Sequence, residues 1–128
     1  MQYMSPGFVK ISGKAHPFHE VRRLVEHYKR NNDAINKEYS ELHRYLSQLN
    51  LLTLPASEFD NFGDVADSVA SRAKKFASTL DAVPYETLYE MAGKDPLTVA
   101  KVLLSIHRRL RHLYEFFDQG RVDFKELR

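Results

Sequence analysis

The chain has 128 residues, 43% hydrophobic and 28% charged, which suffices for one globular domain with its own core. It contains no cysteine, which excludes disulfide bonds, thiolate zinc sites and a cysteine nucleophile. The formal net charge of +2 excludes a uniformly cationic surface that would bind nucleic acid indiscriminately.

Residues 1–16 are predicted to form an N-terminal arm before a single domain, residues 17–128. Turn-forming residues interrupt the arm at Ser5-Pro6-Gly7 and Ser12-Gly13. The arm lacks the apolar run of a signal peptide, and no part of the chain has the length and hydrophobicity of a membrane span. We therefore expect a cytoplasmic protein, or a nuclear one if the source is eukaryotic, without a membrane partner.

A long first helix is predicted over residues 18–51. Apolar side chains recur at seven-residue intervals, at Val21, Tyr28, Ile35, Leu42 and Leu49. No Gly or Pro lies between Phe18 and Leu52. Asn31 and Asn32 interrupt this stripe at its middle, which indicates either a bend or a polar group that sets the register of a partner helix.

Three further helices are predicted over residues 60–81, 84–92 and 96–118. The apolar face of the first of these comprises Val65, Val69, Ala73, Phe76, Ala77 and Leu80. The apolar face of the last comprises Val99, Ala100, Val102, Leu103, Ile106, His107, Leu110, Leu113, Tyr114 and Phe117. Pro84 is expected to begin the short helix and Gly93 to end it, while Asp95-Pro96 is typical of a helix start. The predicted fold is an all-α bundle of three or four helices.

The length of the first helix suggests an interaction surface. The later helices are shorter, so one end of the first helix is expected to project and to present apolar side chains with a basic rim. The residues concerned are Val21, Leu24, Val25 and Tyr28, rimmed by Arg22 and Arg30. This pattern predicts a protein–protein interaction or assembly module, acting as an adaptor or regulator and including a homodimer formed through this helix. In the alternative, Phe8 and Ile11 of the arm cover the same patch.

The segment Ala92–Leu104, AGKDPLTVAKVLL, resembles the turn and recognition helix of helix-turn-helix repressors. The resemblance extends over residues 85–104 and implies that Lys94, Thr98 and Lys101 face the major groove of DNA, with Val99 and Val102 directed inward. Tyr89 departs from the small residue usual four positions before the turn Gly. The alternative is an α-hairpin built from ordinary capping residues.

A basic cluster extends this second hypothesis. Lys101, Ser105, Arg108, His112 and Glu115 share one polar helical face, and Arg109 and Arg111 lie close by. Residues 96–128 carry 7 Lys/Arg and 4 Asp/Glu, so a local basic surface is compatible with the low net charge. Arg108, Arg111 and His112 are therefore candidate phosphate contacts of a nucleic-acid-binding protein. In the alternative they form a solvated surface, with Arg108 or Arg111 paired to Glu115.

The C-terminal stretch Gly120–Leu127, GRVDFKEL, resembles the second half of an EF-hand calcium loop. Gly120, Val122, Asp123, Phe124 and Glu126 match that half. The first half departs from the family, because Phe117 occupies a ligand position. Calcium binding is the second alternative function, beside a simple helix cap followed by a packed turn.

We find no constellation of residues that predicts an enzyme. The chain has no Gly-x-Ser-x-Gly elbow, glycine-rich phosphate loop, His-Glu-x-x-His motif or paired Glu-x-x-His motifs. No metal site or cofactor is expected. His107 lies on the apolar stripe of the last helix and is expected to be a core histidine with one hydrogen-bond partner. The sequence favours a non-enzymatic binding module.

Overall fold

The computed structural model describes residues 17–60 and 63–118. Its helices are α2 (Pro17–Gln48), α3 (Asp64–Leu80), α4 (Tyr85–Met91) and α5 (Pro96–Asp118), with a single 3-10 turn, η1 (Ala56–Glu58). No strand occurs within these residues, so the predicted all-α fold is confirmed. The arm (residues 1–16) and the EF-hand-like stretch (Gly120–Leu127) lie outside the described residues.

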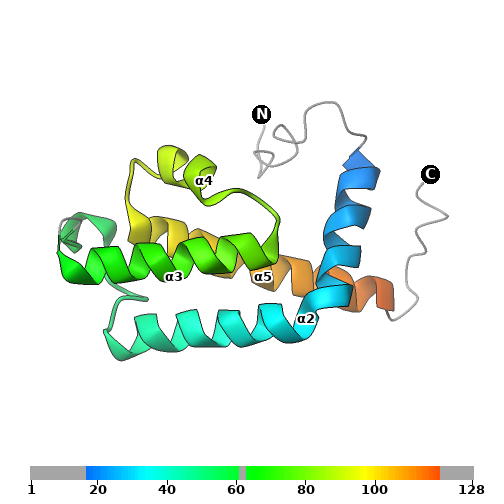
Figure 1. The fold of residues 1–128 in the computed structure, drawn as a ribbon, viewed down its shortest axis with the longest axis horizontal. Coiled ribbons are helices and arrows are strands. Elements are labelled where there is room, and N and C mark those ends of the chain that lie inside the picture. Colours follow the sequence, from blue (N-terminus) through cyan, green and yellow to red (C-terminus); the bar gives the residue numbers. More distant parts are fainter. Residues whose placement is uncertain (1–16, 61–62, 119–128) are drawn as a thin grey trace.

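Helix α2 is bent near its middle, as one of the two expectations for the Asn pair predicted. Asn31 has non-helical backbone angles (φ −122°, ψ 19°). Its side-chain Nδ2 donates a hydrogen bond to the carbonyl of His27 (3.0 Å), and Asn32 Nδ2 donates to the carbonyl of Lys29 (2.9 Å). The bend interrupts the backbone hydrogen bonds of the helix, and these side-chain amides bind carbonyl groups that would otherwise lack a donor. The first half of α2 (17–30) therefore runs in a clearly different direction from the second half (32–48) (Figure 1).

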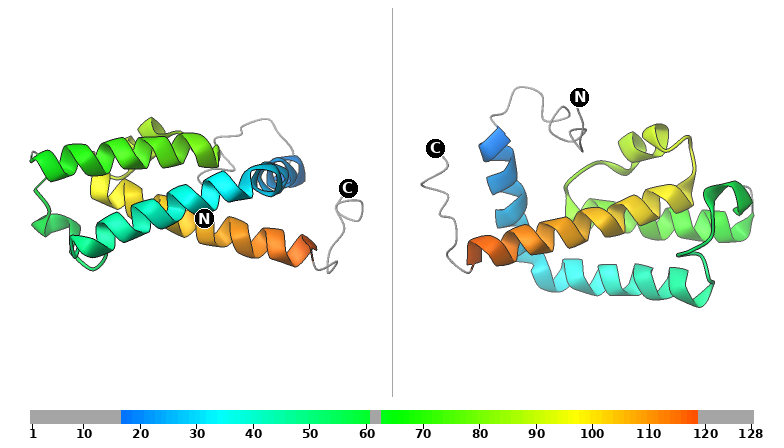
Figure 2. Two further views of the ribbon diagram at one scale, coloured as in Figure 1. Left: turned by 60° about the horizontal axis from the view of Figure 1, so that its bottom comes forward. Right: turned by 180° about the vertical axis from the view of Figure 1, so that it is seen from behind.

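The second half of α2, α3 and α5 pack against one another, and the short α4 contacts α3 and α5 (Figures 1 and 2). Their apolar faces form one core. Its largest fully buried side chains are Tyr28, Phe76, Ile35, Leu42, Leu46, Leu80, Leu97, Leu103, His107, Val69 and Val99. Such a core follows when amphipathic helices bury their apolar stripes against one another.

The seven-residue and helical spacing predicted burial at three positions that are exposed in the structure. Leu49, Val65 and Val102 were predicted on apolar faces but are 41%, 42% and 36% exposed. Leu49 lies beyond the end of α2, and Asn50 has a positive φ of 58°, so the chain has already left the helix. In α3, Ala66 is buried instead of Val65. Neighbouring helices cover only the centre of each stripe, which periodicity cannot reveal.

Capping residues set the junction between α4 and α5 as predicted. The carboxylate of Asp95 accepts hydrogen bonds from the Leu97 backbone N–H (3.1 Å) and from the Thr98 hydroxyl (2.6 Å), which makes it the N-cap of α5. Gly93 follows the end of α4 with a φ of 68°, a left-handed conformation that glycine adopts without strain. Pro84 is the N-cap of α4 rather than its first residue.

Candidate functional site

Three polar side chains meet inside the core, between α2 and α5. The Tyr28 hydroxyl donates a hydrogen bond to Asn36 Oδ1 (3.0 Å). His107 Nε2 lies 2.9 Å from the same oxygen and, facing an acceptor, carries the proton. Tyr28 and His107 are 2% and 0% exposed, so the two donors are shielded from water, whereas Asn36 is half-buried.

Burial and nearby positive charges favour the neutral form of His107. Burial first, and then the positive charges of Arg111 and Arg108, lower the pKa of His107 from 6.5 to about 4. The ring stacks on Tyr39 with centroids 4.0 Å apart, and its Nδ1 has no hydrogen-bond partner in the described part of the chain. The expected core histidine with one hydrogen-bond partner is thus confirmed. Because no solvent reaches the ring, a substrate could not contact it in this conformation, and its evident role is to join α2 to α5.

Sequence reasoning missed one member of this cluster, Asn36. Asn36 lies eight residues after Tyr28 and next to the buried Ile35, so helical spacing alone places it at the edge of the apolar stripe. A polar side chain at such an edge was the available signal. Its partner His107 is 71 residues away, and nothing local to either residue indicates the pairing.

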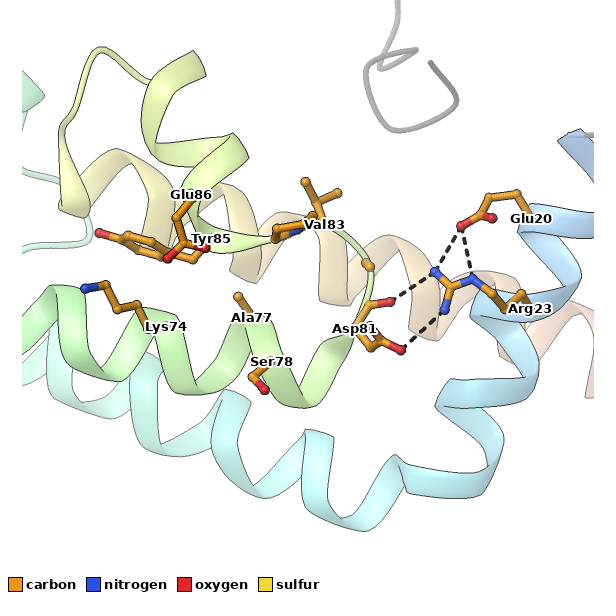
Figure 3. Close-up of a pocket in the computed structure, with 11 residues that line it drawn as sticks. Glu20, Arg23, Lys74, Ala77, Ser78, Asp81, Val83, Tyr85 and Glu86 are labelled. Atoms are coloured by element: carbon orange, nitrogen blue, oxygen red, sulfur yellow. Dashed lines mark hydrogen bonds and ion pairs between the residues drawn. The ribbon is translucent and has the colours of Figure 1, made fainter. Parts of the chain in front are cut away.

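The first half of α2 is held against α3 by polar contacts at the end of that helix. His27 Nε2 donates to the carbonyl of Thr79 (2.9 Å). The Arg23 guanidinium contacts the carboxylate of Asp81 (3.4 Å), donates to the Asp81 carbonyl (3.1 Å), and pairs with Glu20 (2.9 Å). Figure 3 shows this arginine between the two acidic residues. These contacts fix the direction taken by the bent helix.

The prediction of an exposed apolar patch on the first helix is wrong. Leu24, Val25 and Tyr28 are only 2% to 3% exposed, and Val21 is half-buried. The bend explains the difference, because it turns this segment back towards α3 and α5, where the Tyr28 ring lies 5.4 Å from Tyr114. The two rim arginines differ: Arg22 is half-buried and pairs with Glu26 (3.6 Å), whereas Arg30 is exposed.

The helix-turn-helix-like segment has the arrangement of an α-hairpin built on capping residues. Lys94 is exposed with a φ of 64°, but the Thr98 hydroxyl is bound to Asp95. Lys101 Nζ donates to the carbonyl of Leu54 (2.7 Å), so its ammonium group is directed to the loop after α2. The inward direction predicted for Val102 is wrong, while Val99 is fully buried. Two of the three predicted groove-reading side chains therefore serve internal hydrogen bonds.

The outer face of α5 carries arginines that have no internal partner among the described residues. Arg108, Arg109 and His112 are exposed and Arg111 is half-buried. Among residues 17–60 and 63–118, no hydrogen bond or ion pair reaches any of the three arginines, and the pairing with Glu115 considered above is not formed. We call the exposed residues Val102, Arg108, Arg109, His112 and Phe116, together with the half-buried Ser105, the outer face of α5. This face combines free guanidinium groups with partly exposed apolar side chains.

A groove of about 610 Å³ opens between the first half of α2, the end of α3 and the connection to α4. The Arg23 network borders one end, and Lys74 lies at the other, its Nζ 5.4 Å from the centre of the Tyr85 ring (Figure 3). The Tyr85 hydroxyl has no hydrogen-bond partner among the described residues, and because it is buried it does not offer a contact to a ligand in the groove. Burial is the main cause of its raised pKa. The groove thus presents charges of both signs, and its described lining residues form no recognisable catalytic or ligand-binding arrangement.

No protein-family model matches the chain, and neither a curated protein nor a solved structure is significantly similar to it. Within the described part of the chain, no three His, Asp or Glu side chains are grouped so as to hold a metal ion. None of the helices in that part combines the length and apolar character needed to cross a membrane.

Proposed function

We propose that this protein is a non-enzymatic helical module that binds a protein partner through the outer face of α5. The observation that carries the proposal is the presence of Arg108 and Arg109, which have no counter-ion within residues 17–60 and 63–118, beside the partly exposed Val102 and Phe116. Val102, Arg109 and Phe116 follow one another at seven-residue intervals and so line the same side of the helix.

This composition suits a protein interface. Arginine and aromatic side chains are enriched where partners meet, because they combine apolar area with directed hydrogen bonds. Arginine also binds carboxylates through paired N–H donors. A partner with an acidic surface would therefore satisfy the free guanidinium groups and cover the apolar side chains. The apolar surface with basic neighbours that we expected on the first helix is replaced in this proposal by the outer face of α5.

The test compares capture of partners from an extract of the source cells by three forms of the full chain. These are the wild type, Arg108→Glu/Arg109→Glu, and the control Lys74→Glu/Lys75→Glu, which reverses two exposed charges on α3. We expect a discrete partner, resistant to nuclease treatment, with the wild type and the control but not with the α5 variant. Equal capture by all three forms would show that the interface lies elsewhere.

Nucleic-acid binding is the second candidate, favoured by the same unpaired arginines together with the neighbouring His112. Its weakness is that Thr98 and Lys101 are engaged in internal hydrogen bonds. Fluorescence anisotropy with labelled duplex and single-stranded oligonucleotides tests it at low and near-physiological salt. Micromolar binding that weakens steeply with salt and is lost in Arg108→Glu/Arg111→Glu would support this candidate over a protein partner. Absence of binding at low salt would eliminate it.

A further inference from the structure

The bend at Asn31 joins two segments that remain in register with one continuous helix. Val21, Tyr28, Ile35 and Leu42 follow at seven-residue intervals on both sides of the bend. Asn31 is the residue of α2 with non-helical angles, and no Gly or Pro enforces the change. A straight α2 is therefore compatible with the same sequence, because only a local change of backbone angles separates the two forms.

The first half of α2 is buried by atoms that every copy of this chain presents. His27 binds the carbonyl of Thr79, Arg23 binds Asp81, and Tyr28 binds Asn36 and packs at 5.4 Å from Tyr114. If α2 straightens, its first half leaves these positions vacant on its own bundle. A second copy in the same form has the identical set of positions vacant, so each first half can occupy the place left by the other.

We propose that α2 straightens at Asn31 and exchanges its first half between two copies of this chain, so that the partner subunit's Tyr28 completes the Asn36–His107 cluster. A straight monomer would expose Leu24 and Val25 as well as Tyr28, all now buried, which is unfavourable. Exchange restores every one of these contacts in the dimer. The partner is a second copy rather than an unrelated protein, because only this chain supplies the matching contacts.

The side-chain amides of Asn31 and Asn32 set the balance between the two forms. In the bent form they donate to the carbonyls of His27 and Lys29. Alanine cannot make these bonds and has a higher helix propensity than asparagine. Asn31→Ala/Asn32→Ala should therefore destabilise the bent form and strengthen the exchanged dimer, lowering its dissociation constant by about tenfold or more.

The experiment measures both mass and connectivity in the full chain. Multi-angle light scattering over a range of protein concentrations gives the dissociation constant of the dimer. Because the chain has no native cysteine, Arg23→Cys/Asp81→Cys provides two exposed thiols whose parent side chains lie 3.4 Å apart. A short bismaleimide then links the cysteine at position 23 to the cysteine at position 81. The link lies within one chain in the bent form and between two chains in the exchanged dimer, which a denaturing gel distinguishes.

We expect a dimer with a between-chain link in the cysteine pair combined with Asn31→Ala/Asn32→Ala. The control Lys29→Ala/Asp33→Ala shortens two exposed side chains on either side of the bend and should behave as the wild type. A dimer whose link stays within one chain would overturn the proposal, since it would be an ordinary surface dimer. A monomer at all concentrations would also overturn it.

A second test retains Asn31 and Asn32, so it does not depend on whether the alanine variant folds. The cysteine pair removes the side-chain contact between Arg23 and Asp81 from the bent form and from the exchanged dimer alike, so its loss does not favour either form. The cysteine pair alone is unfolded, refolded at high and at low protein concentration, and then cross-linked. Exchange predicts between-chain links that increase with the concentration during refolding. Links that stay within the chain at every concentration would contradict it. This outcome is separate from the partner-capture result, because the exchange does not involve the outer face of α5.

Discussion

The hydroxyl of Tyr28 and the Nε2–H of His107 donate hydrogen bonds to one oxygen atom, Oδ1 of Asn36, at 3.0 and 2.9 Å. This shared acceptor connects the two halves of the bent α2 and joins both to α5. Buried polar groups of this kind stabilise only when each has its partner, so a single amide controls two donors. The relationship makes the core unusually sensitive to residue 36.

Replacing Asn36 with Leu should lower the free energy of unfolding by about 2 to 4 kcal/mol, because it leaves two buried donors without an acceptor. Urea unfolding followed by circular dichroism measures the change. The triple variant Asn36→Leu/Tyr28→Phe/His107→Leu removes the donors as well and should recover part of the loss. A triple variant less stable than Asn36→Leu alone would contradict the proposed cause.

Stability should fall in mildly acidic solution because of His107. Its pKa is lowered from 6.5 to about 4, so between these values the unfolded chain binds a proton that the folded chain does not. The contribution is fully present above pH 6.5, and the free energy of unfolding decreases as the pH is lowered towards 4, by roughly 3 kcal/mol. The difference between the unfolding free energies of the wild type and His107→Leu, measured across this range, isolates the effect. A difference that does not change with pH would disprove it.

Replacing Asp95 with Ala should cost about 1 to 2 kcal/mol, because the α5 N-terminus loses its cap. Asp67→Ala, at an exposed position in the first turn of α3, is the matched control and should cost less than about 0.5 kcal/mol. Chemical denaturation of both variants provides the comparison. Equal effects of the two changes would rule out a specific capping role for Asp95.

Two valines three residues apart on α5 should respond differently to truncation. Val99 is fully buried whereas Val102 is 36% exposed. Val99→Ala should destabilise by roughly 2 kcal/mol through loss of apolar contact and the remaining cavity. Val102→Ala should change stability by less than about 0.5 kcal/mol. Thermal and urea unfolding measure both changes and so test which side of α5 faces the core. A larger destabilisation by Val102→Ala than by Val99→Ala would mean that the outer face of α5 is assigned to the wrong side of the helix.

Local signals in the sequence determined the helices themselves. Asp95-Pro96 marked the start of α5 and Gly93 the end of the preceding helix, because caps act through backbone groups a few residues away. Asn31 and Asn32 marked the position of the bend for the same reason, since their amides bind carbonyls within one turn. Seven-residue spacing found the buried Tyr28, Ile35 and Leu42.

Only the tertiary structure decided what covers those helices. The direction of the bend, which buries Leu24 and Val25 instead of presenting them, depends on contacts with the end of α3 and with α5. The pairing of Asn36 with His107 joins positions 71 residues apart, and the exposure of Val102 depends on which side of α5 its neighbours occupy. Periodicity records where a helix is apolar, but burial is a property of two surfaces in contact, and the second surface comes from distant parts of the chain.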